Sequence, residues 1–265
     1  MMPPGSQNMD FKCALVTGGG GGIGKAMSQY FISQGKQVII AGRTESNLKA
    51  TAKEIGVTAY YVLDTGRVAD IQSFVGKITK EHPEIDCLVN NAGVQRPLEV
   101  LKQDPDEFLQ KADQEIDINI RGPMHLALAF LKHFKAKEHS MIINVSSVLG
   151  FVPFSVINPV YNGTKAWLHF WSLAISRTQL RGTSVRIVEI APPAVGTDLH
   201  RDRDDPDDNK KHKNPDALSI EEFIDEISKK LERGDEMITA GIGNAIVDKW
   251  DETMGAKYAE MTEAS

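Results

Sequence analysis

Residues 13–24, which read CALVTGGGGGIG, decide the fold of this 265-residue chain. A short apolar run, typical of a buried strand, passes directly into five consecutive glycines, and residues 22–34 continue with helical spacing. Glycines permit positive φ values and close approach of the backbone, and a helix that begins here points its N–H groups at whatever the turn holds. This order of strand, glycine turn and helix predicts a dinucleotide pyrophosphate site. The alternative is a flexible glycine turn without a ligand.

The rest of the chain alternates short apolar runs with segments of helical period. The expected strands are residues 12–17, 37–41, 57–63, 85–89, 141–145, 184–190 and 237–240. The expected helices are residues 22–34, 45–55, 68–80, 105–135, 159–180 and 219–231. Strands that alternate with helices predict an α/β fold, with a doubly wound parallel sheet in a three-layer α/β/α arrangement. We expect one domain over residues 11–265, preceded by a flexible extension at residues 1–10.

Individual residues mark where some of these helices begin or bend. Thr44 is expected to cap the helix that follows it, and Ser219 with Glu222 has the pattern of a capping box. Gly122 and Pro123 are expected to break or bend the long helical stretch around them, because proline lacks the N–H that a helix interior needs.

The composition is that of an ordinary globular protein, with 41% apolar and 25% charged residues. The formal net charge is −6, so the chain offers no basic surface for nucleic acid or for an anionic membrane. No apolar stretch approaches the roughly 18 residues that span a bilayer, and no secretory signal is recognisable. We therefore expect a soluble, cytoplasmic protein.

Much of the acidity lies in the last quarter of the chain. Residues 198–265 carry ten basic and nineteen acidic side chains. Within them, residues 200–213, HRDRDDPDDNKKHK, have no apolar side chain to bury. We therefore expect this segment to be a mobile or disordered loop.

Neither a disulfide framework nor a metal site is expected. The two cysteines, Cys13 and Cys87, lie in apolar runs and are expected to be buried small hydrophobic residues. The seven histidines include no H-E-x-x-H pattern, so the sequence gives no reason to expect a bound metal.

The end of the second expected strand indicates the type of dinucleotide. An acidic residue there would bind the adenosine ribose of NAD, whereas this chain has Gly42 followed by Arg43. An arginine would pair with the 2′-phosphate of NADP, so Arg43 favours NADP(H) over NAD(H). Glu45 lies two residues further on, and we interpret it as an acid that compensates the dipole of the next helix.

Three further short motifs follow in order. They are residues 90–93 (NNAG) after the fourth expected strand, Ser146 and Ser147 after the fifth, and Tyr161 with Lys165 at the start of the next helix. Residues four apart share one face of a helix, and a lysine ammonium beside a tyrosine favours the phenolate and lowers its pKa from about 10. Such a tyrosine could pass a proton to or from a substrate oxygen, while a serine hydroxyl binds the same oxygen.

Together the motifs T-G-x-x-x-G-I-G, N-N-A-G, S-S and Y-x-x-x-K resemble the short-chain dehydrogenase/reductase family over roughly residues 11–199. The runs APPAV and NNAGVQRP are similar to a subgroup of DltE-like oxidoreductases. The resemblance implies a Rossmann-type fold and an enzyme that transfers hydride between NADP(H) and a carbonyl group or secondary alcohol of a small molecule. It implies a catalytic group in which Tyr161 is the general acid/base, Lys165 tunes it and holds the nicotinamide ribose, Ser147 positions the substrate oxygen and Asn119 supports a proton relay.

The resemblance also implies a set of cofactor-binding residues. In chain order they are Gly18, Gly22, Ile23 and Gly24 at the pyrophosphate, Arg43, Asp64 at the adenine, Asn91, Arg121, Tyr161, Lys165, and Val195 with Thr197 at the nicotinamide carboxamide. Pro193 stands where the family usually has glycine, which fixes φ and removes an N–H on the substrate side of the pocket. Ser147 and Tyr161 are 14 positions apart, one more than is usual in the family, which indicates an insertion near residues 157–159.

Assembly and substrate access also follow from the resemblance. The family commonly forms dimers or tetramers through the helices expected at residues 105–135 and 159–180, so we expect a homodimer or homotetramer. Trp167 and Trp171 lie four apart on the second helix, either in the core or at that interface. Residues 198–218 occupy the place of a mobile substrate lid, and the alternative for residues 200–213 is a solvated loop without catalytic contacts.

Three alternatives remain open at the level of sequence. They are an imine or enone reductase, a redox-neutral enzyme on the same fold, and a non-catalytic NADP(H)-sensing regulator. The complete set of Ser147, Tyr161, Lys165 and Asn119 argues against the regulator, because a sensor needs no proton donor. The sequence does not identify the substrate.

Overall fold

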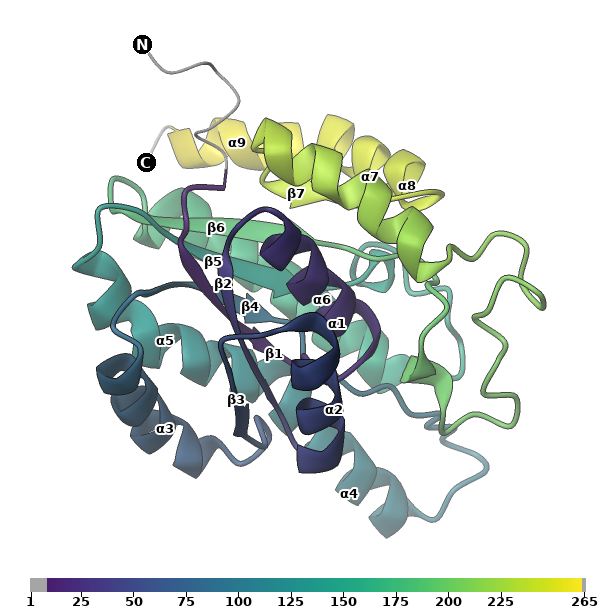
Figure 1. Cartoon of the computed structure of the whole chain (residues 1–265). Helices are drawn as coiled ribbons and strands as arrows, with labels where there is room; N and C mark the ends of the chain where they lie inside the picture. Colours follow the sequence, from purple (N-terminus) through teal and green to yellow (C-terminus); the bar gives the residue numbers. More distant parts are fainter. Residues whose placement is uncertain (1–8, 264–265) are drawn as a thin grey trace.

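The structure, a computed structural model, describes residues 9–263 and builds them around one parallel sheet (Figure 1). Of the extension expected to be flexible, residues 1–8 lie outside the described residues. The strands are β1 Cys13–Thr17, β2 Gln37–Gly42, β3 Ala59–Val62, β4 Ile85–Asn90, β5 Ser140–Val145, β6 Val185–Ile190 and β7 Met237–Ile238. Their order across the sheet is β3-β2-β1-β4-β5-β6-β7, and every neighbouring pair is parallel. The order reverses between β1 and β4, which confirms the expected doubly wound sheet.

Helices connect the strands and cover both faces of the sheet (Figure 1). The α-helices are α1 Gly22–Ser33, α2 Glu45–Ile55, α3 Val68–Glu81, α4 Pro105–Ile116, α5 Gly122–Lys135, α6 Pro159–Ala174, α7 Ile220–Arg233, α8 Gly243–Trp250 and α9 Ala256–Glu263. One cluster of buried side chains joins α1 and α7 to one face of the sheet, and a second cluster joins α3 and α5 to the other. This is the expected three-layer α/β/α arrangement.

Successive residues of β1 contribute to the two layers in turn. Ala14 and Val16 belong to the cluster beneath α1, whereas Cys13 and Leu15 belong to the cluster beneath α5. A central strand covered on both faces therefore needs a continuously apolar sequence, because its side chains point alternately to each face. Cys13 and Cys87 are buried free thiols, as expected, and burial raises the pKa of the Cys13 thiol to about 12.

The ends and breaks of the helices agree in part with the sequence. The capping box of Ser219 and Glu222 opens α7. Thr44 is the N-cap residue of α2, as expected, but its side chain makes no capping hydrogen bond. The long helical stretch is interrupted by a π-helical turn at Asp117–Arg121, directly before α5. Pro123 then lies in the first turn of α5, where its missing N–H costs nothing.

Helices α8 and α9 follow the last strand and lie beyond the elements expected from the sequence. A π-helical turn, Asp251–Gly255, joins them, and another, Ile175–Gln179, directly follows α6. Within residues 9–263, none of the helices is long and apolar enough to cross a bilayer. The same residues contain no group of three or more His, Cys, Asp or Glu side chains that could hold a metal ion. The cytoplasmic location stays a prediction from the sequence.

Candidate active site

A cavity of about 640 Å³ opens at the carboxyl ends of β1, β2, β4, β5 and β6. Its lining includes Gly18, Gly42, Asn91, Ser147 and Pro192, which lie at or just after the ends of these strands. Sheets with this topology bind ligands outside the carboxyl ends of their strands, at the point where the strand order reverses. The cavity therefore lies where the fold is expected to hold a ligand.

The glycine turn after β1 is shaped for close packing. Gly18 and Gly22 have φ values of 66° and 51°, a left-handed conformation that favours glycine. A Cβ on Gly24 would collide with the Gly18 carbonyl and with the Asn91 side-chain amide, so α1 can approach the turn only because residue 24 is glycine. Gly18, Gly22 and Ile23 line the cavity, whereas Gly24 supports the turn from behind.

The first turn of α1 presents backbone N–H groups to the cavity. Its N-cap residue, Gly21, provides no side-chain acceptor, and the first turn contains no acidic residue. Gly21, Gly22 and Ile23 all line the cavity. A helix N-terminus without a cap attracts an anion through both its N–H groups and its dipole. These residues therefore fit the pyrophosphate of a dinucleotide.

Asn91 ties this turn to the loop after β4. Its Nδ2 donates to the carbonyl oxygens of Thr17 (2.9 Å) and Gly18 (3.4 Å), and its backbone N–H donates to the Thr17 hydroxyl (3.0 Å). Asn91 also lines the cavity. It thus fixes the positions of the two loops that meet at the point where the strand order reverses.

Arg43 and Asp64 were both predicted to bind the adenosine end of the cofactor, but only Arg43 lines the cavity. Arg43, directly after β2, is exposed and lines the cavity, and its side chain has no hydrogen bond or ion pair with the other residues that the structure describes. Asp64 does not line the cavity. Its Oδ1 accepts from the Gly66 N–H (3.0 Å), while its neighbours Leu63 and Thr65 form part of the lining.

Ser147 and Ser146 follow β5 but have different hydrogen-bond partners. The Ser147 hydroxyl accepts from the Leu149 N–H (3.2 Å) and donates to the Pro192 carbonyl oxygen over a long 3.4 Å. The Ser146 hydroxyl donates to the buried carboxylate of Glu189. This difference favours Ser147 as the serine that meets a substrate oxygen, because Ser146 is already bound to a charged group.

Tyr161 and Lys165 lie one turn apart in α6 and both line the cavity. The Lys165 Nζ lies 5.5 Å from the centre of the Tyr161 ring and donates to the Val145 carbonyl oxygen (2.8 Å). The two residues are only 5% and 4% exposed. The fold thus places a phenol and an ammonium together with Ser147 in one desolvated pocket.

Burial controls the charge of both side chains. It raises the pKa of the Tyr161 phenol, and the Glu115 carboxylate raises it further, whereas Ser147 and Arg203 act in the opposite direction. The lowered tyrosine pKa expected from the sequence is therefore wrong for this arrangement, because desolvation outweighs the favourable partners. Burial also lowers the pKa of the Lys165 ammonium to about 8, against the effect of nearby carboxylates. At neutral pH the phenol keeps its proton.

Asn119 lies one layer behind the cavity, within the π-helical turn before α5. Its Oδ1 accepts from the Val94 N–H (3.0 Å), and its Nδ2 donates to the Val94 carbonyl oxygen (2.8 Å) and to the Thr164 hydroxyl (3.2 Å). A Cβ on Gly93 would lie 3.3 Å from Asn119 Oδ1 and 3.7 Å from Lys165 Nζ, so both side chains flank this glycine. π-Helical turns often occur at functional sites.

Of the remaining residues predicted to bind the cofactor, two line the cavity and one does not. Val195 and Thr197 line the cavity after β6, and a Cβ on Gly22 would lie 3.5 Å from Thr197 Cγ2. Thr197 therefore faces the glycine turn. Arg121 does not line the cavity, and its Nη1 instead pairs with Asp117 Oδ1 (2.8 Å) one turn earlier in the same helix.

Two charged residues near the site were not expected from the sequence. Glu115 of α4 is fully buried, its Oε2 accepts from the Arg96 N–H (3.1 Å), and its Oε1 has no hydrogen-bond partner among the described residues. Burial raises the pKa of the Glu115 carboxyl to about 7. The sequence does contain a signal for Glu115, because it lies four positions, about one helical turn, before Asn119. Arg203 lies in a segment so rich in charge that composition singles out no one arginine.

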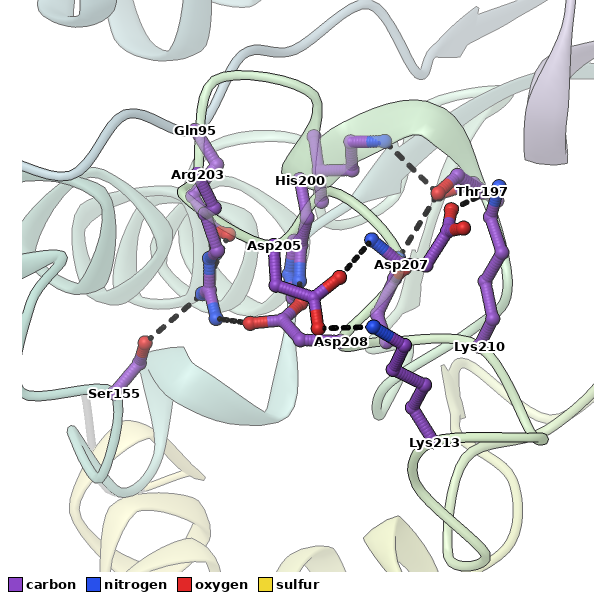
Figure 2. Close-up of polar contacts among 12 residues, drawn as sticks. Gln95, Ser155, Thr197, His200, Arg203, Asp205, Asp207, Asp208, Lys210 and Lys213 are labelled. Atoms are coloured by element: carbon purple, nitrogen blue, oxygen red, sulfur yellow. Dashed lines mark hydrogen bonds and ion pairs between the residues drawn. The ribbon is translucent and has the colours of Figure 1, made fainter.

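The segment after β6 forms an irregular loop at one end of the cavity (Figure 2). Ion pairs join Lys213 to Asp205 (2.5 Å) and Lys210 to Asp207 (2.8 Å) within the loop. Ion pairs between side chains of this loop therefore help to hold its conformation, since residues 200–213 have no apolar side chains of their own to bury. The mobility expected of this segment stays a prediction.

Comparisons with known proteins agree with this geometry. A family model described as short chain dehydrogenase matches residues 12–208, and the chain belongs to this family. The chain is 34% identical to the Uncharacterized oxidoreductase DltE of Bacillus subtilis (strain 168) over 225 residues. These aligned residues cover 85% of this chain and 86% of that protein. It is 36% identical to the NADP-dependent 3-hydroxy acid dehydrogenase YdfG of Escherichia coli (strain K12) over 203 residues. These aligned residues cover 75% of this chain and 79% of that protein.

Solved structures are similar over most of the chain. A short-chain dehydrogenase from Sphingobium yanoikuyae in complex with NADPH gives a TM-score of 0.80 at 24% identity and covers 95% of each chain, which shows the shared fold. The closed form of a serine dehydrogenase complexed with NADP⁺ gives a TM-score of 0.74 at 30% identity and covers 86% of this chain and 94% of that chain.

The expected family, its DltE-like subgroup and the expected fold class are therefore confirmed. The protein is an oxidoreductase of the short-chain dehydrogenase/reductase family, which binds a nicotinamide cofactor. The residues described above fit that group, because a glycine turn without Cβ atoms and an uncapped helix N-terminus lie beside Ser147, Tyr161 and Lys165.

Proposed function

We propose that the protein transfers hydride between NADP(H) and a carbonyl group, or the corresponding secondary alcohol, of a small molecule. The observation that carries this proposal is the meeting of Ser147, Tyr161 and Lys165 in the cavity that the glycine turn also enters. A proton donor, a hydroxyl group and a cation beside a dinucleotide site are the groups that reduction of a carbonyl needs. A relative named as a 3-hydroxy acid dehydrogenase supports an alcohol or carbonyl as the reacting group.

Each side chain has a defined part in this reaction. When bound, the nicotinamide supplies or accepts the hydride. The raised pKa of Tyr161 keeps its phenol protonated at neutral pH, so Tyr161 can give a proton to a substrate oxygen that gains negative charge. Ser147 donates a hydrogen bond to the same oxygen. Lys165 binds the nicotinamide ribose, and Asn119 holds the loop of Val94 beside it.

The residues at the cofactor end of the cavity support NADP(H) over NAD(H). Arg43 is exposed, lines the cavity and has no partner among the described residues, so its charge is available to a 2′-phosphate. The first turn of α1 would hold the pyrophosphate, and Val195 with Thr197 the carboxamide. A relative named as NADP-dependent and a similar structure complexed with NADP⁺ support the same cofactor.

The test is NADPH oxidation with a panel of ketones and quinones, for the native protein and for Tyr161→Phe. We expect the native protein to turn over part of this panel, and the variant to lose roughly 10²- to 10⁴-fold in kcat while it still binds NADPH. Tight NADPH binding without turnover would favour the NADP(H)-sensing regulator, and turnover of imines or enones alone would favour those reductases. Full activity in Tyr161→Phe would show that another group supplies the proton.

A further inference from the structure

Arg203 joins the loop after β6 to the walls of the cavity (Figure 2). Its Nη2 donates to Gln95 Oε1 (2.9 Å), Asn158 Oδ1 (2.6 Å) and Ser155 Oγ (3.3 Å), and its Nη1 donates to Asp208 Oδ2 (2.6 Å). The side chain is only 14% exposed. The fold therefore holds one arginine of a highly charged loop in a fixed orientation at the cavity.

One edge of this guanidinium lacks an anionic partner. Nη2 contacts three neutral oxygens, and the adjacent Nε is buried with no hydrogen-bond partner among the described residues. A buried N–H without a partner is costly, and two neighbouring N–H groups of an arginine match the two oxygens of a carboxylate. Asp208 pairs with Nη1 and Nε has no acceptor, so the edge formed by Nε and Nη2 is the one suited to a second carboxylate. The two hydrogens of Nη2 are already shared by three neutral acceptors, so a carboxylate bound at this edge takes Nε and displaces at least one of them.

The neighbours of Arg203 place this edge on the substrate side of the cavity. Gln95 directly follows Val94, which binds Asn119, and Ser155 lies in the segment between Ser147 and the start of α6. Arg203, Gln95 and Ser155 line the same cavity as the catalytic residues. The charge of Arg203 also acts on the Tyr161 phenol, where it lowers the pKa against the larger effect of burial. Arg203 is thus within electrostatic reach of the reacting oxygen.

We propose that Arg203 binds a carboxylate group of the substrate, so that the protein prefers keto acids and hydroxy acids to neutral ketones and alcohols. This inference rests on the proposed hydride transfer, which places the reacting oxygen at Ser147 and Tyr161. In the reductive direction, the carbonyl carbon gains the hydride that NADPH gives up, and the oxygen gains the proton of Tyr161. The carboxylate keeps its charge throughout, so Arg203 determines specificity and takes no part in proton transfer.

The test is equilibrium binding of acetoacetate and of 4-oxopentanoate, each compared with its methyl ester, to the protein saturated with NADP⁺. The oxidised cofactor has no hydride to give, so binding is measured without turnover. We expect the native protein to bind each acid at least about tenfold more tightly than its ester, as a charge-assisted hydrogen-bonded pair allows. Arg203→Met should abolish this preference. Arg203→Lys should keep part of it, because lysine retains the positive charge but lacks the planar fork that binds both carboxylate oxygens.

Two further variants separate a contact from a general effect of charge. Lys211→Met removes a positive charge from the same loop, where Lys211 pairs with Glu222 outside the cavity, and should keep the preference. Asp208→Asn removes the anion that competes for Arg203, so it should strengthen binding of the acids several-fold and leave the esters unchanged. The double variant Arg203→Met, Asp208→Asn restores the net charge and should still show no preference. A recovered preference in the double variant would overturn the proposal.

The affinity for NADP⁺ is the control for folding and for the cofactor. Arg203→Met should bind NADP⁺ as the native protein does, and a loss of NADP⁺ affinity with an unchanged preference for acids would show that Arg203 serves the cofactor. No preference of the native protein for either acid, including no binding of acid or ester, would overturn the carboxylate site. Selective binding of acids without any NADPH oxidation would instead refute the proposed hydride transfer and leave the carboxylate site in place.

Discussion

Glu115 shows how one buried carboxylate affects Tyr161 and Lys165, the two side chains that we propose are catalytic. It raises the pKa of the Tyr161 phenol and of the Lys165 ammonium, and burial raises the pKa of its own carboxyl to about 7. Its charge therefore changes near neutral pH, where the enzyme is expected to work. The carboxylate favours protonated Tyr161 and charged Lys165, and both effects fade as Glu115 gains a proton.

Glu115→Gln should move the alkaline limit of activity. Lys165 has a pKa of about 8, so NADPH-dependent turnover should fall as the pH rises through that value and the ammonium is lost. Without the Glu115 carboxylate the pKa of Lys165 falls further, so the decline should begin at a lower pH. The measurement is kcat/KM over a range of pH, with Glu107→Gln on the exposed side of α4 as the control. An alkaline limb at the same pH in both variants would contradict this role.

At the scale of one side chain, Arg43 is the residue that we propose selects NADP(H). Arg43→Asp replaces a positive charge at the end of β2 with the negative charge that would repel a 2′-phosphate, so NADPH affinity should fall roughly a hundredfold. NADH affinity should change little or improve, because an acid there can bind the ribose hydroxyl groups. Equilibrium dissociation constants for both cofactors test this, with the exposed Lys53→Asp of α2 as the control. Equal losses for NADPH and NADH would contradict it.

Gly24 controls how closely α1 packs on the glycine turn. Gly24→Ala would drive a Cβ into the Gly18 carbonyl group, and backbone atoms cannot move aside as a flexible side chain can. We expect a clear drop in melting temperature and at least about tenfold weaker NADPH binding, because α1 must shift away from the turn. Gly76→Ala in α3 is the matched control, since a Cβ there meets no atom within 4 Å and should stabilise the helix slightly. A Gly24→Ala protein as stable as the control would disprove the packing argument.

The central strands could be predicted closely because their sequences must be apolar on both faces. β2, β4 and β6 differ from their expected ranges by one residue at an end, and all three are buried between helix layers. The edge strands were predicted less well. β3 and β7 have a neighbour on one side only, and both are shorter than the apolar runs that contain them. Apolar residues beyond the paired length still pack, so hydrophobicity alone does not show where pairing stops.

The candidate site could be predicted where a residue belongs to a short motif with its own local geometry. The glycine turn and the pair of Tyr161 and Lys165 are of this kind, since their spacing alone sets a turn or a helix face. Arg203 could not be found in this way. Its neutral partners Asn158 and Gln95 lie 45 and 108 positions away, so its position depends on the folded loops.

At the scale of the whole molecule, the acidity of the chain is kept away from the cofactor site. The charged residues of the cavity lining are Arg43, Lys165, Arg201 and Arg203 on the positive side and Asp198 and Asp208 on the negative side. Other acids of the loop are taken up by ion pairs, such as Asp205 with Lys213 and Asp207 with Lys210. A chain with a net charge of −6 can therefore still present a positive cavity to a polyanionic dinucleotide.

The outer surfaces of α5 and α6 bear on assembly. Leu128 of α5 and Phe170 of α6 are 61% and 59% exposed, and Trp167 and Trp171 stack on α6 with ring centres 5.5 Å apart. Large exposed apolar side chains on neighbouring elements are typical of interaction surfaces. The resemblance to the family implies assembly through these same two helices, so a homodimer or homotetramer remains the prediction.

Leu128→Glu and Phe170→Glu, singly and combined, should dissociate such an oligomer. A carboxylate buried in an apolar interface without a partner costs several kcal/mol, whereas at a free surface it costs almost nothing. Light scattering should therefore show the native protein as a dimer or tetramer and the double variant as a monomer, with unchanged helix content. Leu101→Glu, at a residue 98% exposed outside both helices, should keep the native mass. A monomeric native protein, or a double variant with the native mass, would contradict assembly through α5 and α6.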